Sequence, residues 1–184
     1  FLKARGAGEP RASAEWLLAH VLACGRLEVR RGTMEVSPGQ ERDFFGMLER
    51  RAAGEPVSYI TGMHNFMGIK LDITPDVLIP RPEPEELVEK SLKIKLPEKP
   101  VFADIGTGSG CIAVALALKK MKSSVFATDI SGDALGVASR NAEKNGVARR
   151  ITFINCDLAS GLGKVDMIVS NPPYVTVSEM KCLQ

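Results

Sequence analysis

The stretch "ADIGTGSGCIAVALA", residues 103–117, decides how this chain is expected to fold. Its apolar start is typical of a buried strand and its apolar end of a helix. Between them lie three glycines, Gly106, Gly108 and Gly110. Glycines at a strand-to-helix turn let backbone amides approach a ligand closely, and the N-terminus of the helix faces the same point. The stretch therefore predicts a ligand-binding loop at the carboxyl edge of a parallel sheet.

Strand and helix patterns alternate around this loop. Apolar runs predict four strands, at 101–105, 124–130, 151–155 and 165–170. Helical spacing predicts two helices, from Ser109 to about Lys119 and from Asp133 to Asn145. This alternation is typical of βαβ units, so we expect an α/β fold with a Rossmann-like parallel sheet covered by helices on both faces.

The first third of the chain has a helical pattern instead. Residues 10–24 carry apolar residues at helical spacing, with Ser13 as a candidate N-cap and Gly25 as a stop, and a second helix follows Ser37 up to Gly54. The aromatic residues of these helices are expected to pack in a core. They are Trp16, Phe44 and Phe45.

From Val57 the pattern changes to β-branched and aromatic alternation broken by glycines, which predicts a hairpin. A further helix is expected in the acidic stretch after Pro82, with Pro84 in its first turn. We therefore expect a helical domain over 1–55, a hairpin linker over 56–80 and the sheet domain over 81–184.

Composition narrows the function. The 184 residues contain 24 Lys and Arg against 22 Asp and Glu, so the net charge of +2 does not indicate a large nucleic-acid footprint. Three arginine pairs are expected on the solvated surface. The four cysteines are scattered without a CxxC motif, which argues against a metal site and for an intracellular, reducing compartment. The longest apolar run is too short to span a membrane.

Acidic residues around the loop indicate which ligand it holds. Counting GxGxxG from Gly106 ends on Cys111 rather than Gly or Ala, so the match to a dinucleotide fingerprint is imperfect. Asp104 would repel a pyrophosphate but favour a cofactor with an ammonium and a sulfonium, which points to S-adenosylmethionine. Asp129, at the end of the second strand, could accept hydrogen bonds from ribose hydroxyls, and Asp157 from the adenine amine. The alternative for each aspartate is helix capping or turn formation.

The turn "NPPY", residues 171–174, follows the fourth strand at the same edge of the sheet. Two prolines stiffen the turn and remove two backbone donors. The Asn171 side-chain oxygen and the Pro172 carbonyl could together accept both hydrogens of an NH₂ group, while Tyr174 packs on a planar substrate. This arrangement would align a poorly nucleophilic nitrogen with a methyl donor. It predicts N-methylation of an amide or aromatic amine.

Four stretches in order, "GEPVSYITG", "VLIPRPEPEELVE", "DIGTGSGCIAVALA" and "DMIVSNPPYV", resemble the HemK-type protein-glutamine N-methyltransferases. The resemblance implies a class I, S-adenosylmethionine-dependent methyltransferase whose substrate is the glutamine of the Gly-Gly-Gln motif in a peptide chain release factor. It assigns two groups of residues. The cofactor group is Gly106, Thr107, Gly108, Ser109, Gly110, Asp129 and Asn171, with Asp157 and Leu158 near the adenine. The glutamine group is Asn171, Pro172, Pro173 and Tyr174.

This chain departs from the family pattern at Leu158, where an aromatic residue is frequent, and at Pro84, where Thr is usual. The family's sheet has three further strands, so we expect a sheet truncated after the fourth strand and, since Phe1 is not an initiator, a natural protein that begins upstream. The expected compartment is the mitochondrial matrix in a eukaryote or the cytoplasm in a bacterium. Two other functions stay open: an adenine N-methyltransferase acting on nucleic acid, disfavoured by the charge, and a non-catalytic cofactor-binding partner subunit.

Overall fold

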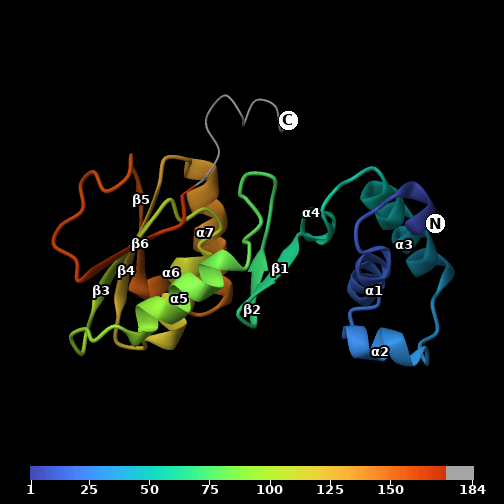
Figure 1. The fold of residues 1–184 in the computed structure, drawn as a ribbon, viewed down its shortest axis with the longest axis horizontal. Helices are drawn as coiled ribbons and strands as arrows, with labels where there is room; N and C mark the ends of the chain where they lie inside the picture. The colour runs from blue at the N-terminus through green and yellow to red at the C-terminus, as the bar shows by residue number, and fades with distance from the viewer. Residues whose placement is uncertain (173–184) are drawn as a thin grey trace. The chain divides into compact units, whose positions relative to one another are not determined.

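The computed structural model of the chain describes residues 1–172 (Figure 1). Its contacts divide the chain after Met63 into an N-terminal unit and a sheet unit that begins at His64. The predicted division at residues 55 and 80 stays a prediction, and each unit is described by itself.

The N-terminal unit is helical. It contains η1 (Lys3–Arg5), α1 (Pro10–Val21), α2 (Arg26–Arg31), α3 (Pro38–Ala52) and α4 (Val57–Thr61). A capping box starts α3, because the Ser37 hydroxyl accepts from the Gln40 amide while the Gln40 side chain accepts from the Ser37 amide. By contrast, Ser13 does not cap α1. That helix starts at Pro10, so Ser13 is buried inside the helix.

The strand predicted from Val57 is wrong, because residues 57–61 form α4. The apolar side chain of Ile60 packs with Leu2, Leu17 and Leu48 in the core of this unit, and Val57 lies against the same cluster. Positions 57 and 60 lie on one face of a helix but would point to opposite faces of a strand. Burial of both side chains against one core therefore favours the helix.

The core prediction for the aromatic residues is only partly right. Phe44 packs against the leucine cluster, but Phe45 is exposed and Trp16 is 48% exposed. The guanidinium of Arg26 lies 4.8 Å from the centre of the Trp16 ring. Helical spacing identified the helices correctly, but the expectation that Phe45 and Trp16 pack in the core is wrong.

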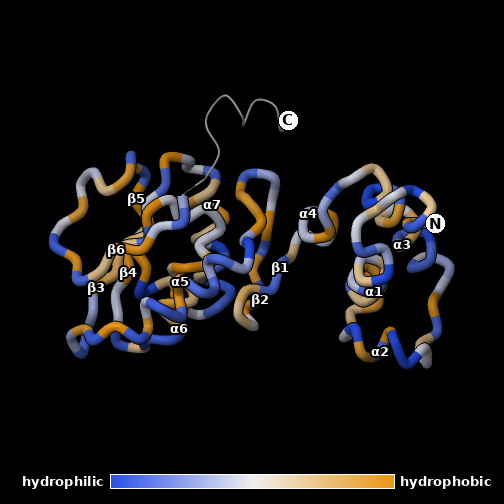
Figure 2. The backbone as a smooth tube through the Cα atoms, in the orientation of Figure 1, coloured by the Kyte–Doolittle hydropathy of each residue, from blue (hydrophilic) through white to orange (hydrophobic). Residues whose placement is uncertain are grey.

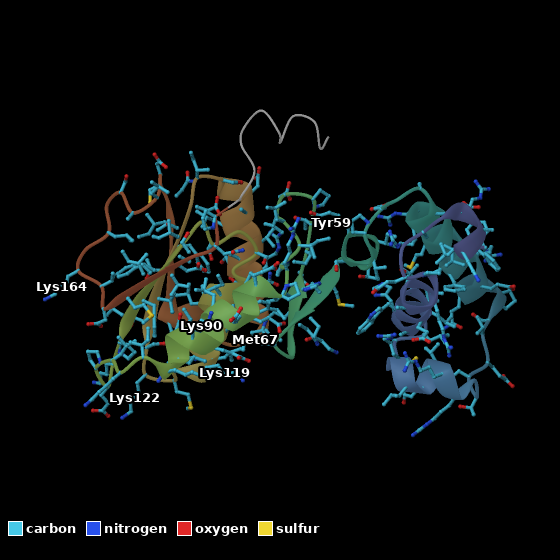
Figure 3. The ribbon with its side chains drawn as sticks, in the orientation of Figure 1. Tyr59, Met67, Lys90, Lys119, Lys122 and Lys164 are labelled. Carbon is cyan, nitrogen blue, oxygen red and sulfur yellow. The ribbon has the colours of Figure 1, made fainter. Side chains whose placement is uncertain are left out.

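The sheet unit starts with a hairpin, β1 (Met63–Phe66) and β2 (Ile69–Asp72), followed by α5 (Glu83–Lys93). The hairpin turn is held against α5, since the Met67 amide donates to Glu85 Oε1 at 2.9 Å. Figure 3 labels Met67 in this turn and Lys90 on α5. The alternating part then runs β3 (Val101–Ile105), α6 (Cys111–Lys119), β4 (Ser124–Asp129), α7 (Gly132–Lys144), η2 (Ala148–Arg150), β5 (Ile151–Asn155) and β6 (Met167–Ser170).

The four strands of the main sheet are parallel in the order β5-β4-β3-β6. The register pairs Asp104 with Ala127 on one side and with Val169 on the other. Because sequential strands add outward from β3 and the chain then crosses to β6, the sheet reverses its strand order beside β3. This is where a doubly wound sheet binds its ligand.

Within the described residues, α6 packs against both α5 and α7 and contacts the sheet, so these helices form one layer on one face. The strand residues on that face are buried, among them Phe102, Val125 and Val169. On the opposite face Ile168 is 59% exposed. The expected helices on both faces are therefore not found in this part of the chain, and the apolar run of α6 lies in the buried layer (Figure 2).

None of the three arginine pairs is simply solvated: Arg30 pairs with Glu15 on α1, and a residue of each other pair bonds within its unit. Arg51 donates to the Gly8 carbonyl at 3.0 Å and to the Ser13 hydroxyl at 3.2 Å, which ties α3 to the start of α1. Arg150 donates to the carbonyls of Ala117, Lys120 and Met121 at the end of α6. A cation at a helix C-terminus is favourable, so Arg150 stabilises the end of α6.

Candidate cofactor and substrate site

The glycine loop, residues 106–110, lies between β3 and α6 as predicted. Its three glycines have φ values of 69°, 53° and 78°, in the left-handed region that disfavours other residues. The Thr107 amide donates to the Thr128 carbonyl at 2.9 Å, and Gly110 donates to the Thr107 carbonyl at 2.9 Å. Thr107 and Ser109 are buried. The loop is therefore a fixed turn anchored to the neighbouring strand β4.

Gly110 is needed for space as well as for its backbone conformation. A Cβ at this position would lie 2.9 Å from the Cβ of Ala138 on α7. The loop thus touches α7 backbone to backbone, which fixes how closely the start of α6 approaches that helix.

Asp104 lies at the end of β3 beneath the loop and is 1% exposed. Its Oδ2 accepts from the Thr107 hydroxyl at 2.7 Å and from the Ala113 amide at 3.1 Å. Its Oδ1 is buried and has no hydrogen-bond partner among the described residues. Burial raises the pKa of Asp104 to about 6, against the lowering effect of these hydrogen bonds. A buried acceptor without a partner is rare, and it leaves this carboxylate able to receive a donor.

Asp129 ends β4 and lies beside the loop. Its Oδ2 accepts from the Gly108 amide at 2.9 Å, and its Oδ1 accepts from the Ser131 amide at 3.0 Å. Ser131 in turn caps α7 through the Ala134 amide. The turn-forming role that was the alternative for Asp129 is therefore present. Each carboxylate oxygen can accept a second hydrogen bond, so a ligand role remains compatible with it.

Asp157 and Leu158 follow β5. Asp157 is exposed, and Leu158 is 69% exposed with a φ of 49°. The Leu158 carbonyl accepts from the buried Thr128 hydroxyl at 2.8 Å, which holds this turn to β4. Ile130, after β4, is 77% exposed. Two large apolar side chains are thus exposed at the carboxyl ends of neighbouring strands.

Asn171 and Pro172 follow β6, whose last residue Ser170 pairs with Ile105 at the end of β3. The Ser170 hydroxyl donates to the Ile105 carbonyl at 2.8 Å, which fixes the end of β6 beside the glycine loop. Asn171 is half-buried and Pro172 is exposed. Pro173 and Tyr174, the rest of the predicted turn, lie outside the described residues.

Sequence reasoning missed two asparagines that organise this edge. Asn155 Nδ2 donates to the carbonyls of Asp129 and Ile130, both at 2.9 Å. Asn141 on α7 is fully buried and donates to the Ser109 carbonyl at 2.9 Å. An asparagine on the apolar stripe of a predicted helix, between Ala138 and Ala142, was the signal that could have identified Asn141.

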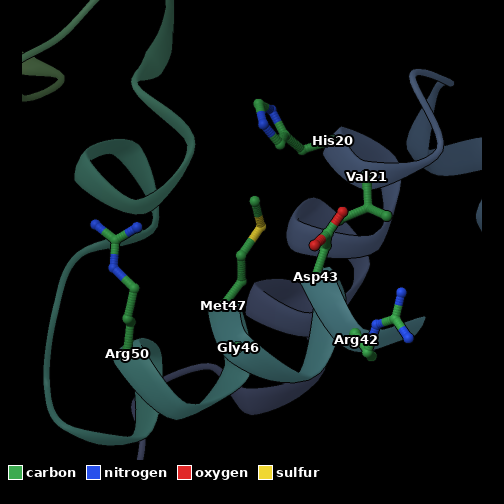
Figure 4. Close-up of a pocket in the computed structure, with 7 residues that line it drawn as sticks. All are labelled: His20, Val21, Arg42, Asp43, Gly46, Met47 and Arg50. Carbon is green, nitrogen blue, oxygen red and sulfur yellow. The ribbon is translucent and has the colours of Figure 1, made fainter. Parts of the chain in front are cut away.

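The N-terminal unit has an open hollow of about 550 Å³ between α1 and α3 (Figure 4). His20 and Val21 of α1 line it with Arg42, Asp43, Gly46, Met47 and Arg50 of α3. No ring of ligating side chains occurs there. Across the described residues, no group of three or more His, Cys, Asp or Glu could hold a metal ion. None of the helices found in residues 1–172 is long and apolar enough to cross a membrane.

Comparison with known families matches residues 1–62 to the PrmC N-terminal domain and residues 86–182 to the Methyltransferase small domain. The release factor glutamine methyltransferase of Nitratidesulfovibrio vulgaris is 40% identical over 97% of this chain and 62% of its own length. That of Chlorobaculum tepidum is 39% identical over 100% of this chain and 67% of its own length. The chain thus spans roughly two thirds of these bacterial relatives.

Among solved structures, the M. jannaschii tRNA m1G37 methyltransferase aligns with a TM-score of 0.52 and 21% identity, over 60% of this chain and 34% of the other. At this identity the likeness concerns the fold. Together with the matched methyltransferase domain and the parallel sheet, it confirms the predicted Rossmann-like class I methyltransferase fold.

Proposed function

Because the chain belongs to the release factor glutamine methyltransferase family, we propose that its protein methylates the side-chain amide nitrogen of a release-factor glutamine. The acceptor is the glutamine of a Gly-Gly-Gln motif, and the methyl donor is S-adenosylmethionine. The observation that carries this proposal is the match of both regions of one chain, the N-terminal unit and the sheet unit, to relatives of that name.

The residues of the glycine loop fit the cofactor. The unpartnered Asp104 Oδ1 suits a cationic donor such as an ammonium group, and a glycine loop at a helix start leaves backbone amides near the ligand. Asp129 would accept from the ribose hydroxyls, while Asp157 and Leu158 would lie near the adenine. The remaining contacts come from Gly106, Thr107, Gly108, Ser109 and Gly110. When bound, S-adenosylmethionine supplies a sulfonium methyl group that an amide nitrogen can attack.

Asn171 and Pro172 hold the reacting amide in this proposal. The Asn171 side-chain oxygen and the Pro172 carbonyl accept the two N–H bonds of the glutamine, and Pro173 and Tyr174 complete the substrate site. An amide nitrogen is a weak nucleophile because its lone pair is delocalised. Accepting both hydrogens orients that lone pair and stabilises the positive charge that develops on nitrogen. The proton then leaves to water, so no dedicated base is needed.

The position of Asn171 supports this role. It directly follows Ser170, which is tied to Ile105 one residue before the glycine loop. The acceptor turn and the cofactor loop therefore start from adjacent strands at one edge of the sheet, as a methyl transfer between two bound groups requires.

The proposal is tested by incubating the full-length protein with S-adenosylmethionine labelled in its methyl group, a release factor and DNA in the same reaction. We expect label on the release factor, located by mass spectrometry at the Gly-Gly-Gln glutamine, and none on DNA. A release factor with that glutamine replaced is the matched blank. Equal labelling of the blank, or labelling of DNA, would contradict the assigned acceptor.

A further inference from the structure

The buried face of α7 carries one polar side chain, Asn141, among alanine, leucine and valine residues. Asn141 is fully buried there, and three hydrogen bonds occupy its side-chain amide. Its Nδ2 donates to the carbonyls of Ser109 and Asp72, each at 2.9 Å, and its Oδ1 accepts from the Asp72 amide at 2.6 Å. A single side chain thus joins Ser109 in the glycine loop to Asp72 in strand β2, two residues that lie 37 positions apart in the sequence.

On the loop side, the hydrogen bond from Asn141 lies next to the close contact between the glycine loop and α7. Ser109 precedes Gly110, whose missing Cβ allows the contact with Ala138, one helical turn before Asn141 on α7. The loop is therefore held at two adjacent residues, by packing at Gly110 and by a hydrogen bond at Ser109. Any change in the position of Asn141 is transmitted to a residue that is expected to contact the cofactor.

On the hairpin side, the last residue of α7 and its C-cap also bond to β2. Lys144 pairs with the Asp72 carboxylate, and Asn145 Nδ2 donates to the Lys70 carbonyl at 3.2 Å. Both residues are on the surface side of the contact. Among the described residues, Asn141 is the one of these three side chains that bonds to both β2 and the glycine loop.

We propose that Asn141 is a positioning residue that couples the glycine loop to the hairpin, so that cofactor occupancy of the loop rigidifies β2. Burial makes this coupling strong, because a buried amide that loses a partner finds no water to replace it. The loop and β2 must therefore keep their places together or break these bonds together. The inference rests on the proposed function only in taking S-adenosylmethionine as the ligand of the loop.

The first test measures S-adenosylmethionine binding to the full-length protein by calorimetry. Asn141→Asp keeps the size and the acceptor but replaces the donating NH₂ with an oxygen that faces two carbonyls. We expect its dissociation constant to rise at least tenfold. Asn145→Ala is the matched control, since it removes bonds to the Lys70 and Asn141 carbonyls and none to the loop. Its dissociation constant should stay within twofold of wild type.

A purely structural role for Asn141 would give a different pattern. Val88→Ala on α5 removes buried volume at a residue that makes none of these hydrogen bonds, so it should lower the melting temperature yet leave the dissociation constant unchanged at temperatures where the protein is folded. If Asn141→Asp weakens binding no more than Val88→Ala does, Asn141 only supports the fold and the proposal is overturned.

The second test needs no variant. Hydrogen exchange of the peptide covering 69–72 is compared without and with saturating S-adenosylmethionine, and the cofactor should slow exchange there in wild type. Unchanged exchange in β2 overturns the coupling even if Asn141→Asp cannot be produced in folded form. If wild type does not bind S-adenosylmethionine, the inference and the proposed cofactor fall together. Binding and protection without methylation of a release factor would support the coupling and reject the proposed acceptor.

Discussion

The two units of this chain each bury a carboxylate, and they treat it in opposite ways. Glu15 on α1 receives guanidinium groups from Arg11, Arg26 and Arg30, and hydrogen bonds from Arg30 and then Arg26 lower its pKa to about 2. Among the described residues, no cation raises or lowers the pKa of Asp104 and its Oδ1 has no partner, and burial raises this pKa to about 6.

The difference separates a carboxylate that holds two helices together from one with an oxygen left to accept a further hydrogen bond. Glu15 links α1 to α2 and is already satisfied, so it stabilises its unit without any other molecule. Asp104 is costly to keep ionised in the folded chain, and a cationic ligand would relieve that cost. An uncompensated buried carboxylate is expected where a protein binds something, so the contrast supports the cofactor role proposed for Asp104.

The largest effect is expected from a substitution in the proposed substrate site that changes neither Glu15 nor Asp104. Asn171→Ala should lower turnover at saturating cofactor by roughly a hundredfold, because the lost acceptor acts mainly on the reacting nitrogen, while the dissociation constant of the cofactor changes little. Rates are measured with a release-factor domain as acceptor. Asn171→Asp, which keeps an acceptor oxygen, should retain more activity than Asn171→Ala. Equal loss in the two variants would instead indicate that the Asn171 NH₂ acts as a donor.

The next prediction compares one substitution in the two units. Gly110→Ala adds a Cβ that meets Ala138 in a left-handed backbone conformation, and it should destabilise the protein by about 3 kcal/mol. Gly46→Ala, at an exposed position within α3 where a Cβ meets no atom, should stabilise it by about 0.5–1 kcal/mol. Denaturant unfolding measures both. A mild effect of Gly110→Ala would mean that α7 can move away from the loop.

The same contrast explains what the sequence could predict. The glycine loop, the strands 101–105 and 151–155 and the helix α7 follow from local patterns, because repeated βαβ units impose the same burial on each element. Residues 57–61 were misread because Val57 and Ile60 are buried together on one helical face. Trp16 was misread because its ring lies at the surface beneath Arg26. Asn141 and Asn155 depend on partners far along the chain, such as Asp72, so no local pattern specifies their bonds.

The third prediction concerns Asp104 and pH. Its folded pKa of about 6 lies above the ordinary 3.8, so the folded state binds this proton more tightly than the unfolded state. Asp104 therefore costs no stability below about pH 4, and its contribution becomes unfavourable as pH rises from about 4 to 6, by on the order of 2–3 kcal/mol. Asp104→Asn should remove this slope.

Unfolding free energies of wild type and Asp104→Asn, measured between pH 4 and 7 without cofactor, give that slope by difference. The variant should also bind S-adenosylmethionine more weakly, because the oxygen that would receive its ammonium group is gone or replaced by a donor. A variant that binds the cofactor as tightly as wild type would remove Asp104 from the site and leave its unpartnered oxygen a structural feature of the loop.

The smallest expected effect has the opposite sign and lies in the helical unit. The folded pKa of Glu15, about 2, is below its ordinary value of 4.5, so the ionised group stabilises the unit fully above about pH 4.5. That contribution is lost as pH falls from about 4.5 to 2. Glu15→Gln should therefore unfold at a lower temperature than wild type at pH 7, and the difference in melting temperature should close as the solution is acidified.

Glu86→Gln, which breaks an exposed pair with Lys90 on α5, is the control and should change the melting temperature much less. If the gap for Glu15→Gln were independent of pH, its ionic partners would contribute little and packing of its alkyl chain would account for the effect. Glu15 and Asp104 would then differ only in the number of their hydrogen-bond partners, and no longer in how strongly the protein stabilises their ionised forms.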